Sequence, residues 1–427
     1  MTLSTAYALR TAAFDADFDP AAGRPVIARG SGATLVDVDG HESIDLSDII
    51  ANVGHCHPRL VRALHDAMSR MITNKSGTTH PARAELVERL AAMFPLDAPR
   101  VYLVSGGSEA IDWSFRLARR ATGRHEILTF WGGVYGRTYG AMSLNGVRSR
   151  RRFGPAMPGV VHAPYAYCYR CPFDKRPDDC GMFCVDHLDE VLRHASCDDV
   201  AALVVEPYQG VGGMIFPPDG YLTRLQAWAR ERGILFILDE VQSSFGRTGR
   251  RLALEWEGLR PDMVVVGKGL GGGIAIAAVV AEAALFDGVA PGELSGGNGA
   301  APIGCAAALA VLDILEDEGL SAWADDVGAY LIGRLRRWTD DVEEVGDVRG
   351  KGLAIGVEFV RDRATKEPFP ELVRELARRA YHAGVYLSAR SHVLDVRPPL
   401  VITREQAERA ADILDASLRE SLAALVP

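Results

Sequence analysis

The sequence predicts an α/β protein: a large, mostly parallel sheet covered by helices, and a smaller α+β lobe formed by both chain ends. Short apolar runs such as EILTFW, AALVVEP, ILFILDE and DMVVVGKG are too continuous for a sheet with one face in water. Such runs favour buried parallel strands. They alternate with helical patterns such as PARAELVERLAAMF from about residue 58 to about residue 300, as expected for a sheet with helices on its faces.

The elements can be read in chain order. Residues 32–48 contain two β-rich runs around Asp39-Gly40 and predict a hairpin, and residues 100–123 read as strand, glycine turn and helix. Residues 345–360 predict another hairpin, and residues 371–384 and 403–422 predict amphipathic helices. These patterns divide the chain into residues 1–57, a large domain at 58–305 and a smaller domain at 306–427. A cysteine-rich excursion occupies residues 165–187.

Composition narrows the classes of function. The chain has 427 residues, 24% of them charged, and a net charge of −9, which argues against a nucleic-acid-binding surface. No apolar run approaches the ~20 residues needed to span a bilayer. The first thirty residues lack the pattern of a signal peptide. We therefore expect a cytoplasmic enzyme that acts on small molecules, with no nucleic-acid or membrane partner.

A glycine-rich segment, VVVGKGLGGGIAIAAVV at residues 264–280, invites two interpretations. Gly267, Gly269 and Gly272 fit the spacing of a dinucleotide-binding turn. Such a turn opens a helix and is followed after about 20 residues by an acid that holds the ribose. Here a β-rich run follows instead, and no acidic residue appears before Glu282. The context therefore favours the other interpretation, in which Lys268 itself performs the chemistry.

A lysine that forms a Schiff base with pyridoxal phosphate needs three further groups. Asp239, at the end of the strand-like run ILFILD, can pair with the ring nitrogen. The segment SGGSEA (residues 105–110) joins a strand to a helix and can cradle the phosphate. Gln242, three residues after Asp239, can bind the ring oxygen. The order of these groups along an α/β chain indicates a pyridoxal phosphate enzyme.

These motifs resemble the class-III aminotransferases, the fold-type-I pyridoxal phosphate family that includes ornithine and 4-aminobutyrate aminotransferases and dialkylglycine decarboxylase. The resemblance runs over nearly the whole chain through NVGHCHP, SGGSEA, VYGRTYGAMSL, VVEPYQGVGG, LDEVQSSFGRTG, VVVGKGLGGG and VRPPLVIT. It implies that Lys268 forms the Schiff base, that Asp239 pairs with the pyridine nitrogen and that Gln242 reaches the ring oxygen. It also implies a homodimer with shared active sites.

The same resemblance assigns further cofactor contacts. Gly107 and Ser108 hold the phosphate, Val241 packs against the ring, and Glu206 of the Glu-Pro pair lies beside it. Relatives stack an aromatic residue on the ring where this chain has Val134-Tyr135, so Tyr135 or Trp131 is expected to take that role. Where a neighbouring subunit's threonine touches the phosphate, this chain has Gly297, with Ser295 and Asn298 nearby.

The resemblance also bears on the substrate. Arg137 and Arg397 match the arginines that bind the two carboxylates of glutamate in relatives, which implies ping-pong transamination with L-glutamate as donor. The glutamate that gates the α-carboxylate arginine in many relatives is replaced here by Val211. Asp48 replaces a glutamine that faces the scissile carboxylate in dialkylglycine decarboxylase. An anion there favours a cationic acceptor, such as an aminosugar or aminocyclitol carbonyl of aminoglycoside biosynthesis.

Other interpretations stay open. The cysteine-rich excursion resembles one in family members that racemise amino acids, and Asp48 or Tyr135 would then be the second acid/base group. A catalytically silent partner protein is a further alternative, which the retained site residues disfavour, and an NAD-dependent oxidoreductase is the weakest.

Metal binding is expected to play no part in catalysis. Cys168, Cys171, Cys180 and Cys184 either bind a structural zinc or are unligated thiols. His55 and His57 are expected to be structural.

Overall fold

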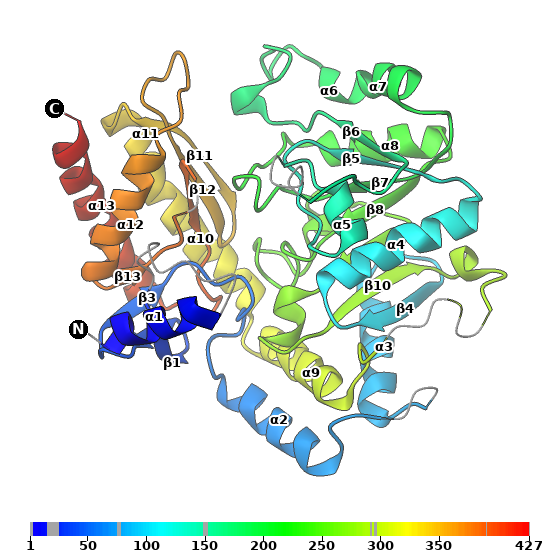
Figure 1. Ribbon diagram of the computed structural model, residues 1–427, viewed down its shortest axis with the longest axis horizontal. Coiled ribbons are helices and arrows are strands. Elements are labelled where there is room, and N and C mark those ends of the chain that lie inside the picture. Colours follow the sequence, from blue (N-terminus) through cyan, green and yellow to red (C-terminus); the bar gives the residue numbers. More distant parts are fainter. Residues whose placement is uncertain are drawn as a thin grey trace.

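A seven-stranded sheet forms the centre of the larger lobe in the computed structural model (Figure 1). The structure describes residues 3–14, 25–74, 78–147, 153–290, 293, 297–389 and 391–426. The strands of the sheet, in spatial order, are β4 (Pro99–Val104), β10 (Ala277–Glu282), β9 (Met263–Val266), β8 (Leu235–Asp239), β7 (Val200–Val205), β5 (Glu126–Phe130) and β6 (Val160–Ala163). The pairs from β9 to β6 are parallel, and β10 is antiparallel to both of its neighbours.

Helices cover both faces of this sheet because alternate residues of each strand point to opposite sides. Met263 and Val265 face one apolar core with α4, whereas Val264 and Val266 face the other core. The helices of this lobe are α2 (Pro58–Arg70), α3 (Pro81–Met93), α4 (Gly107–Thr122), α5 (Tyr139–Leu144), α6 (Phe183–Asp186), α7 (Leu188–Ala195), α8 (Tyr221–Glu231) and α9 (Pro302–Asp317). Short 3-10 helices are η3 (Cys168–Arg170), η4 (Ala253–Trp256), η5 (Lys268–Gly271) and η6 (Ala283–Phe286).

Two smaller sheets form the other lobe. The first has the order β1 (Ile27–Ser31), β2 (Thr34–Asp37), β3 (Glu42–Asp45) and β13 (Val385–Tyr386). The second has the order β11 (Val345–Lys351), β12 (Ala354–Phe359) and β14 (Val393–Val396) and is antiparallel throughout. The helices of this lobe are α1 (Leu3–Phe14), α10 (Leu320–Arg336), α11 (Trp338–Asp341), α12 (Pro370–His382) and α13 (Arg404–Leu425).

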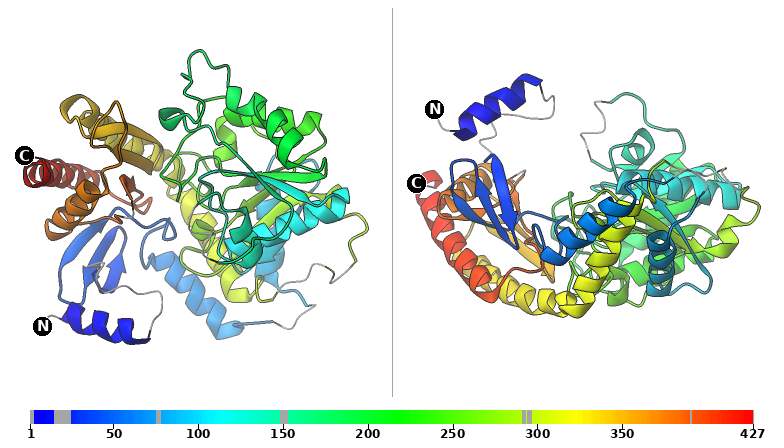
Figure 2. Two further views of the ribbon diagram at one scale, coloured as in Figure 1. Left: turned by 45° about the horizontal axis from the view of Figure 1, so that its top comes forward. Right: turned by 90° about the horizontal axis from the view of Figure 1, so that it is seen from below.

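Both ends of the chain meet in this smaller lobe. Strand β13 pairs in parallel with β3, so that Val385 lies opposite Ile44. Figures 1 and 2 show the two termini in the same lobe, with α12 and α13 side by side and the N-terminal strands nearby. The N-terminal segment is thereby held against the C-terminal part of the chain, beside the C-terminal ends of the parallel strands.

The predicted fold class is confirmed. The hairpin around Asp39-Gly40 is the antiparallel pair β2–β3, and Gly40 has a φ of 88°, which favours glycine. The hairpin predicted at residues 345–360 is the antiparallel pair β11–β12. The domain boundaries stay a prediction, and the one at 305/306 falls inside α9.

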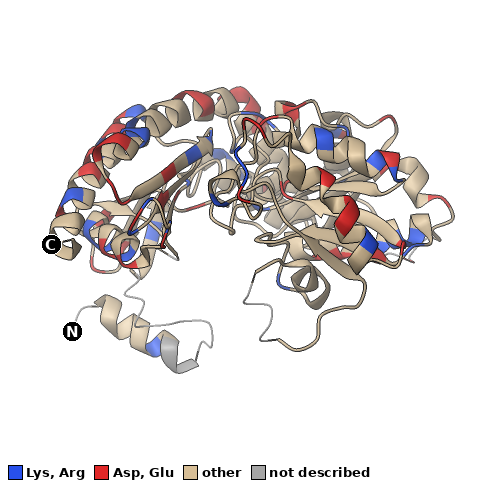
Figure 3. Ribbon diagram, turned by 90° about the horizontal axis from the view of Figure 1, so that it is seen from above, with Lys and Arg blue, Asp and Glu red and all other residues tan. Residues whose placement is uncertain are grey.

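Charged residues of both signs lie together on the described helices of the smaller lobe (Figure 3). Figure 3 shows acidic and basic residues mixed along the row of helices that ends at the C-terminus. Phosphate-binding surfaces gather lysine and arginine on one face, so this mixture gives no sign of such a surface. Within the described part of the chain, no helix combines the length and the apolar character needed to cross a bilayer.

Candidate active site

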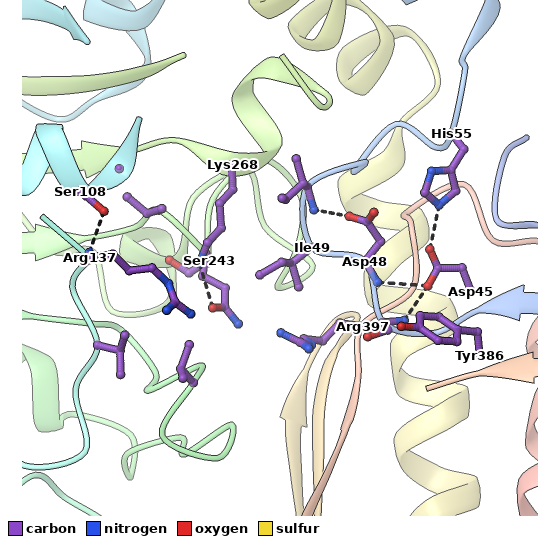
Figure 4. Close-up of a pocket in the computed structure, with 18 of the residues that line it drawn as sticks. Asp45, Asp48, Ile49, His55, Ser108, Arg137, Ser243, Lys268, Tyr386 and Arg397 are labelled. Atoms are coloured by element: carbon purple, nitrogen blue, oxygen red, sulfur yellow. Dashed lines mark hydrogen bonds and ion pairs between the residues drawn. The ribbon is translucent and has the colours of Figure 1, made fainter. Parts of the chain in front are cut away.

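A cavity of about 790 Å³ lies where the C-terminal ends of β7 and β8 meet the N-terminal and C-terminal segments of the smaller lobe (Figure 4). This size suits a small-molecule ligand. Open parallel sheets bind ligands at this edge of the strands. Of the predicted site residues, the cavity is lined by Asp48, Gly107, Ser108, Tyr135, Arg137, Glu206, Asp239, Val241, Gln242, Lys268 and Arg397.

Lys268 follows β9 and begins η5. Its backbone has a φ of 43°, in the left-handed region that is uncommon for a residue other than glycine. Its Nζ atom donates a hydrogen bond to Oε1 of Gln242 at 3.1 Å. Burial lowers the pKa of Lys268, and the charges of Asp239 and Glu206 oppose that effect. The amine is therefore closer to its neutral, nucleophilic form than an exposed lysine would be.

Asp239 is the last residue of β8, and only 6% of its surface is exposed. Its Oδ1 atom accepts a hydrogen bond from the backbone N–H of Val241 at 3.0 Å. Burial raises the pKa of Asp239 to about 6, so the carboxyl is mostly ionised at neutral pH. A buried carboxylate that faces a cavity is suited to pair with a cationic group of a ligand.

Glu206 follows β7 and joins two loops. Its Oε1 atom accepts the backbone N–H of Val134 at 2.9 Å, and its Oε2 atom accepts that of Gly210 at 3.1 Å. Burial, together with the charge of Asp239, raises the pKa of Glu206 to about 8. Both oxygens are thus engaged in holding the cavity wall.

The predicted stacking residues point in different directions. The Tyr135 hydroxyl donates to the carbonyl of Val204 at 3.1 Å, and its ring belongs to the buried core that includes Ile111 and Val265. Burial raises the pKa of Tyr135 well above its usual value. Trp131 is 51% exposed and does not line the cavity. The half-buried Val134 lines the cavity, as Tyr135 does.

The turn before α4 forms a second wall. Gly107 and Ser108 lie in the first turn of a 16-residue helix, where backbone N–H groups and the helix dipole favour an anion. A Cβ atom at Gly107 would lie 2.9 Å from Cγ1 of Val241, so glycine permits the close approach of these segments. The Ser108 Oγ atom accepts the backbone N–H of Arg137 at 3.0 Å and fixes the loop that carries this arginine.

The two arginines differ in their surroundings. Arg397 follows β14, and only 8% of its side chain is exposed. One Nη atom lies 3.4 Å from a carboxylate oxygen of Asp395. Its buried Nε atom has no hydrogen-bond partner among the described residues. Arg137 is exposed at the rim. Val211, 54% exposed, also lines the cavity and supplies no acid to pair with Arg397.

Asp48 lies at the end of the cavity formed by the N-terminal segment (Figure 4). Its Oδ1 atom accepts the backbone N–H groups of Ile50 at 2.5 Å and Ala51 at 2.8 Å. Nearby, Asp45 forms an ion pair with His55 at 2.7 Å, and this hydrogen bond raises the pKa of His55. One side-chain N or O atom from each of Asp45, Asp48 and His55 lies within 4.8 Å of the others. The ion pair joins Asp45 to His55, and the backbone N–H of Asp48 donates a hydrogen bond to Asp45.

Asn298 and His57, both singled out from the sequence, do not line the cavity of their own chain. Asn298 is exposed in the loop before α9 and does not line the cavity. Ser295 falls outside the described residues. His57 caps the N-terminus of α2 by accepting the backbone N–H of Arg59 at 3.3 Å.

The cavity also contains residues that the sequence did not single out. Tyr208, two positions after Glu206, lines the cavity, and its hydroxyl lies 3.5 Å from the carbonyl of Gln242. Its position in the Glu-Pro motif was a usable signal. Arg29 and Tyr386 also line the cavity, from β1 and β13. No local pattern marked them. Tyr386 reaches the cavity through the pairing of β13 with the distant strand β3, whereas Arg29 lies on β1, which pairs with the adjacent strand β2.

Comparison with known proteins shows the family. The class-III aminotransferase profile matches residues 19–418. The chain is 37% identical to a leucine/methionine racemase of Thermococcus litoralis over 93% of this chain and 91% of that protein. It is 33% identical to a probable 4-aminobutyrate aminotransferase of Bacillus subtilis, over 93% of both chains.

Solved structures of transaminases are similar to this chain. An amine transaminase from an uncultivated Pseudomonas species, solved with pyridoxal phosphate bound, superposes with a TM-score of 0.88 at 32% identity. The match covers 93% of this chain and 95% of that one. The protein therefore belongs to the class-III aminotransferase family, and its cofactor is pyridoxal 5′-phosphate.

Proposed function

We propose that this enzyme is an aminotransferase that takes the amino group of L-glutamate and transfers it to a keto or aldehyde acceptor. The observation that carries the proposal is the set of groups around one cavity. A half-buried lysine with a lowered pKa lies beside a buried carboxylate, and an arginine with an unpartnered Nε atom lines the same space. Together these groups suit an amine that bears a carboxylate.

The described residues fit pyridoxal phosphate. Asp239 offers a buried carboxylate to the ring nitrogen, and Gln242 offers an amide to the ring oxygen. Gly107 and Ser108 offer the N-terminus of α4 to the phosphate, and the missing Cβ of Gly107 allows that turn to approach Val241. The bound cofactor supplies a carbonyl carbon that captures amines and a ring that withdraws electrons from them.

Lys268 is the proposed proton carrier. With the cofactor bound, its Nζ atom would take a proton from the α-carbon of the donor and release it again on the same face, so that one group would serve as both base and acid. Water would then release the keto acid and leave the amino group with the enzyme. The lowered pKa of Lys268 favours the neutral amine that can accept this proton. The hydrogen bond to Gln242 orients Nζ toward the cavity.

The arginines account for the choice of donor. Arg397 is suited to bind the α-carboxylate because it is buried and incompletely partnered, and Arg137 is suited to bind the second carboxylate of glutamate at the rim. Because Val211 provides no acidic gate, Arg397 stays available in both half-reactions. The acceptor is then a keto acid or, at the Asp48 end of the cavity, a cationic carbonyl compound related to an aminosugar or aminocyclitol.

A racemase or epimerase is the second candidate, and the 37% identity to a leucine/methionine racemase favours it. Racemisation requires a second acid/base group on the opposite face of the substrate. The Tyr135 hydroxyl is engaged with Val204, and Oδ1 of Asp48 accepts two backbone N–H groups. Because these groups already make hydrogen bonds within the protein, transamination is the better-supported reaction. A catalytically silent partner role is disfavoured by the retained lysine, carboxylate and amide.

The deciding experiment follows the visible spectrum of the purified holoenzyme on addition of L-glutamate. Loss of the yellow absorption band of the bound cofactor, with release of 2-oxoglutarate, supports the aminotransferase. The Lys268→Ala variant should show neither change. A band that stays unchanged with glutamate contradicts the proposed donor. Exchange of deuterium into the α-carbon of leucine or methionine, with inversion and no keto acid, favours the racemase instead.

A further inference from the structure

Four cysteine side chains line one small cavity of about 20 Å³ away from the active site. They are Cys168 and Cys171 around η3, Cys180 in the following turn and Cys184 in α6. All four are half-buried, and none forms a disulfide. The rest of the cavity wall is mainly apolar or aromatic and includes Tyr165, Met182 and Phe183. Four thiols thus gather in a pocket that offers them little else to bind.

The local backbone turns sharply to bring the second pair of thiols to this pocket. Gly181 and Met182 lie between Cys180 and Cys184 with φ values of 53° and 57°, both in the left-handed region. For Met182 this conformation is unfavourable, so the surrounding structure must stabilise it. Arg224 helps by donating a hydrogen bond to the carbonyl of Gly181 and pairing with Asp186 at 2.5 Å.

The excursion has little regular structure with which to hold itself together. Between β6 and α7 it contains only η3 and the four-residue helix α6. Its own apolar cluster is small, with Phe173 in edge contact with Phe183 and His187. Small loop-rich segments of this kind commonly rely on a cross-link or a metal for their stability. The expected cytoplasmic location and the absence of disulfides among these four cysteines favour a metal over a disulfide cross-link.

The four thiols share one cavity wall, and none of them is in a disulfide. A divalent cation would stabilise four thiolates at once, with release of the thiol protons.

We propose that Cys168, Cys171, Cys180 and Cys184 bind one zinc ion as a closed, four-thiolate structural site. The spacing C-x2-C-x8-C-x3-C provides two pairs of ligands, and a tetrahedral site of this kind leaves no position for substrate. The sulfur atoms must draw together to about 3.8 Å from one another. In the structure, no three of these four described sulfur atoms lie within 4.8 Å of one another. Zinc binding would therefore draw the cysteine side chains closer together.

The zinc site fixes a contact between the two lobes. Tyr167 precedes the first ligand pair and Arg170 lies between its two cysteines. Both donate hydrogen bonds to the fully buried carboxylate of Glu358 in β12, Arg170 at 2.5 Å. Lys366 donates to the carbonyl of Tyr169 at 2.6 Å. A rigid turn between Cys168 and Cys171 therefore holds three residues against the smaller lobe.

Metal analysis of the purified holoenzyme tests the proposal. We expect about one zinc ion per chain. Cys168→Ser and Cys180→Ser should each lower the zinc content by roughly tenfold or more. Cys197→Ser is the matched control, because Cys197 is exposed and lies outside the cluster. It should keep the zinc content of the wild type.

A measurement on the wild-type chain covers the case in which the serine variants fail to fold. Treatment with a strong chelator should release zinc, make four additional thiols reactive and lower the unfolding temperature. Adding Zn²⁺ alone should reverse all three changes. The proposal is overturned by a protein with free, reactive thiols and no zinc, by zinc that persists in the serine variants, by two disulfides, or by bound iron in place of zinc.

Discussion

The two arginines of the active site differ in how strongly their removal should act. Arg397 is buried with an unpartnered Nε atom, whereas Arg137 is exposed to water, which screens its charge. Truncating one partner of a buried charge pair costs about 2–5 kcal/mol, whereas an exposed pair contributes about 0.2–1 kcal/mol. The side chain that contributes most to substrate binding should therefore be the buried one.

This difference predicts the kinetics of two variants. Arg397→Met should lower kcat/KM by roughly a hundredfold or more for both L-glutamate and L-alanine, because both carry an α-carboxylate. Arg137→Met should lower it by only a few-fold for L-glutamate and leave L-alanine unaffected. Steady-state kinetics with both donors measures this, with the visible cofactor band as the control for an intact site. Equal losses for the two donors in Arg137→Met would contradict the assignment.

Asp48 provides a test of the acceptor. Asp48→Asn removes the negative charge but keeps an oxygen that can accept the N–H groups of Ile50 and Ala51, so the turn should persist. If a cationic carbonyl compound is the acceptor, its KM should rise by about fivefold to tenfold, since a charge pair near the protein surface contributes about 1 kcal/mol. The KM of L-glutamate should stay unchanged. An unchanged KM for every cationic acceptor would remove the case for this substrate class.

At the junction of β4 and α4, one added methyl group should displace the start of the helix. Gly107→Ala places a Cβ atom 2.9 Å from Val241, so the first turn of α4 or the segment after β8 must move. We expect the dissociation constant of pyridoxal phosphate to rise by about tenfold, equivalent to 1.4 kcal/mol, because N–H groups at a helix start bind an anion only when they are aligned.

Gly106→Ala is the matched comparison, because a Cβ atom there meets no protein atom within 4 Å. Its φ of −172° is open to any residue. Cofactor titration of the two apo proteins measures the difference. If both substitutions weaken cofactor binding equally, the contact between Gly107 and Val241 is not the cause.

The sheet of the smaller lobe depends on a buried carboxylate. Glu358 in β12 accepts hydrogen bonds from Tyr167, Arg170 and Arg349, and His392 lies 3.4 Å away. Burial alone would raise the pKa of Glu358, but the hydrogen bonds and positive charges around it lower that pKa far below its usual range. The ionised form is therefore part of the folded structure.

The sign of the resulting pH dependence follows from this lowered pKa. The contribution of Glu358 to the free energy of unfolding is complete above about pH 4.3, the value for an unfolded glutamate, and is lost as the pH falls further. Glu358→Gln removes the counter-charge of Arg170 and one of the two counter-charges of Arg349, whose other partner is Asp347. It should lower the free energy of unfolding by about 3–5 kcal/mol at neutral pH. Denaturant titration at neutral pH and at about pH 4 measures both effects. A variant as stable as the wild type at neutral pH would contradict this account.

Much of the site could be predicted because its residues follow strands. Asp239 and Glu206 end adjacent parallel strands, whose C-terminal ends meet at one edge of the sheet. The direction of the Tyr135 ring could not be predicted, because it depends on a hydrogen bond from its hydroxyl to the carbonyl of Val204, on another strand. Tyr386 was also missed, since the pairing of β13 with β3 across most of the chain brings it to the cavity. Arg29 on β1 was missed as well.

The complete molecule brings three stretches of chain to one cavity. The N-terminal segment supplies Asp48, the large sheet supplies Lys268 and Asp239, and the C-terminal segment supplies Arg397. Asn298, predicted to contact the phosphate, is exposed outside the cavity of its own chain. In the predicted homodimer, this residue would act in the active site of the partner subunit.

Exposed apolar side chains agree with a dimer. Leu3 and Leu9 on α1 are 57% and 55% exposed, and Ile50 beside the cavity is 45% exposed. Exposed apolar residues of this size are candidates for an interface. We expect sedimentation to give twice the chain mass of 46.1 kDa, which is about 92 kDa.

Mixed dimers test whether Asn298 acts across the interface. Asn298→Ala should raise the dissociation constant of the cofactor by about tenfold, because a hydrogen bond to a charged group contributes about 1.5–3 kcal/mol. In a dimer of one Asn298→Ala chain and one Lys268→Ala chain, contact across the interface leaves one site with both Lys268 and Asn298 intact. That dimer should show about half of the wild-type activity at limiting cofactor, with wild-type affinity at the active site. If Asn298 acts within its own chain, no intact site remains, and the mixed dimer should be as weak as the Asn298→Ala protein.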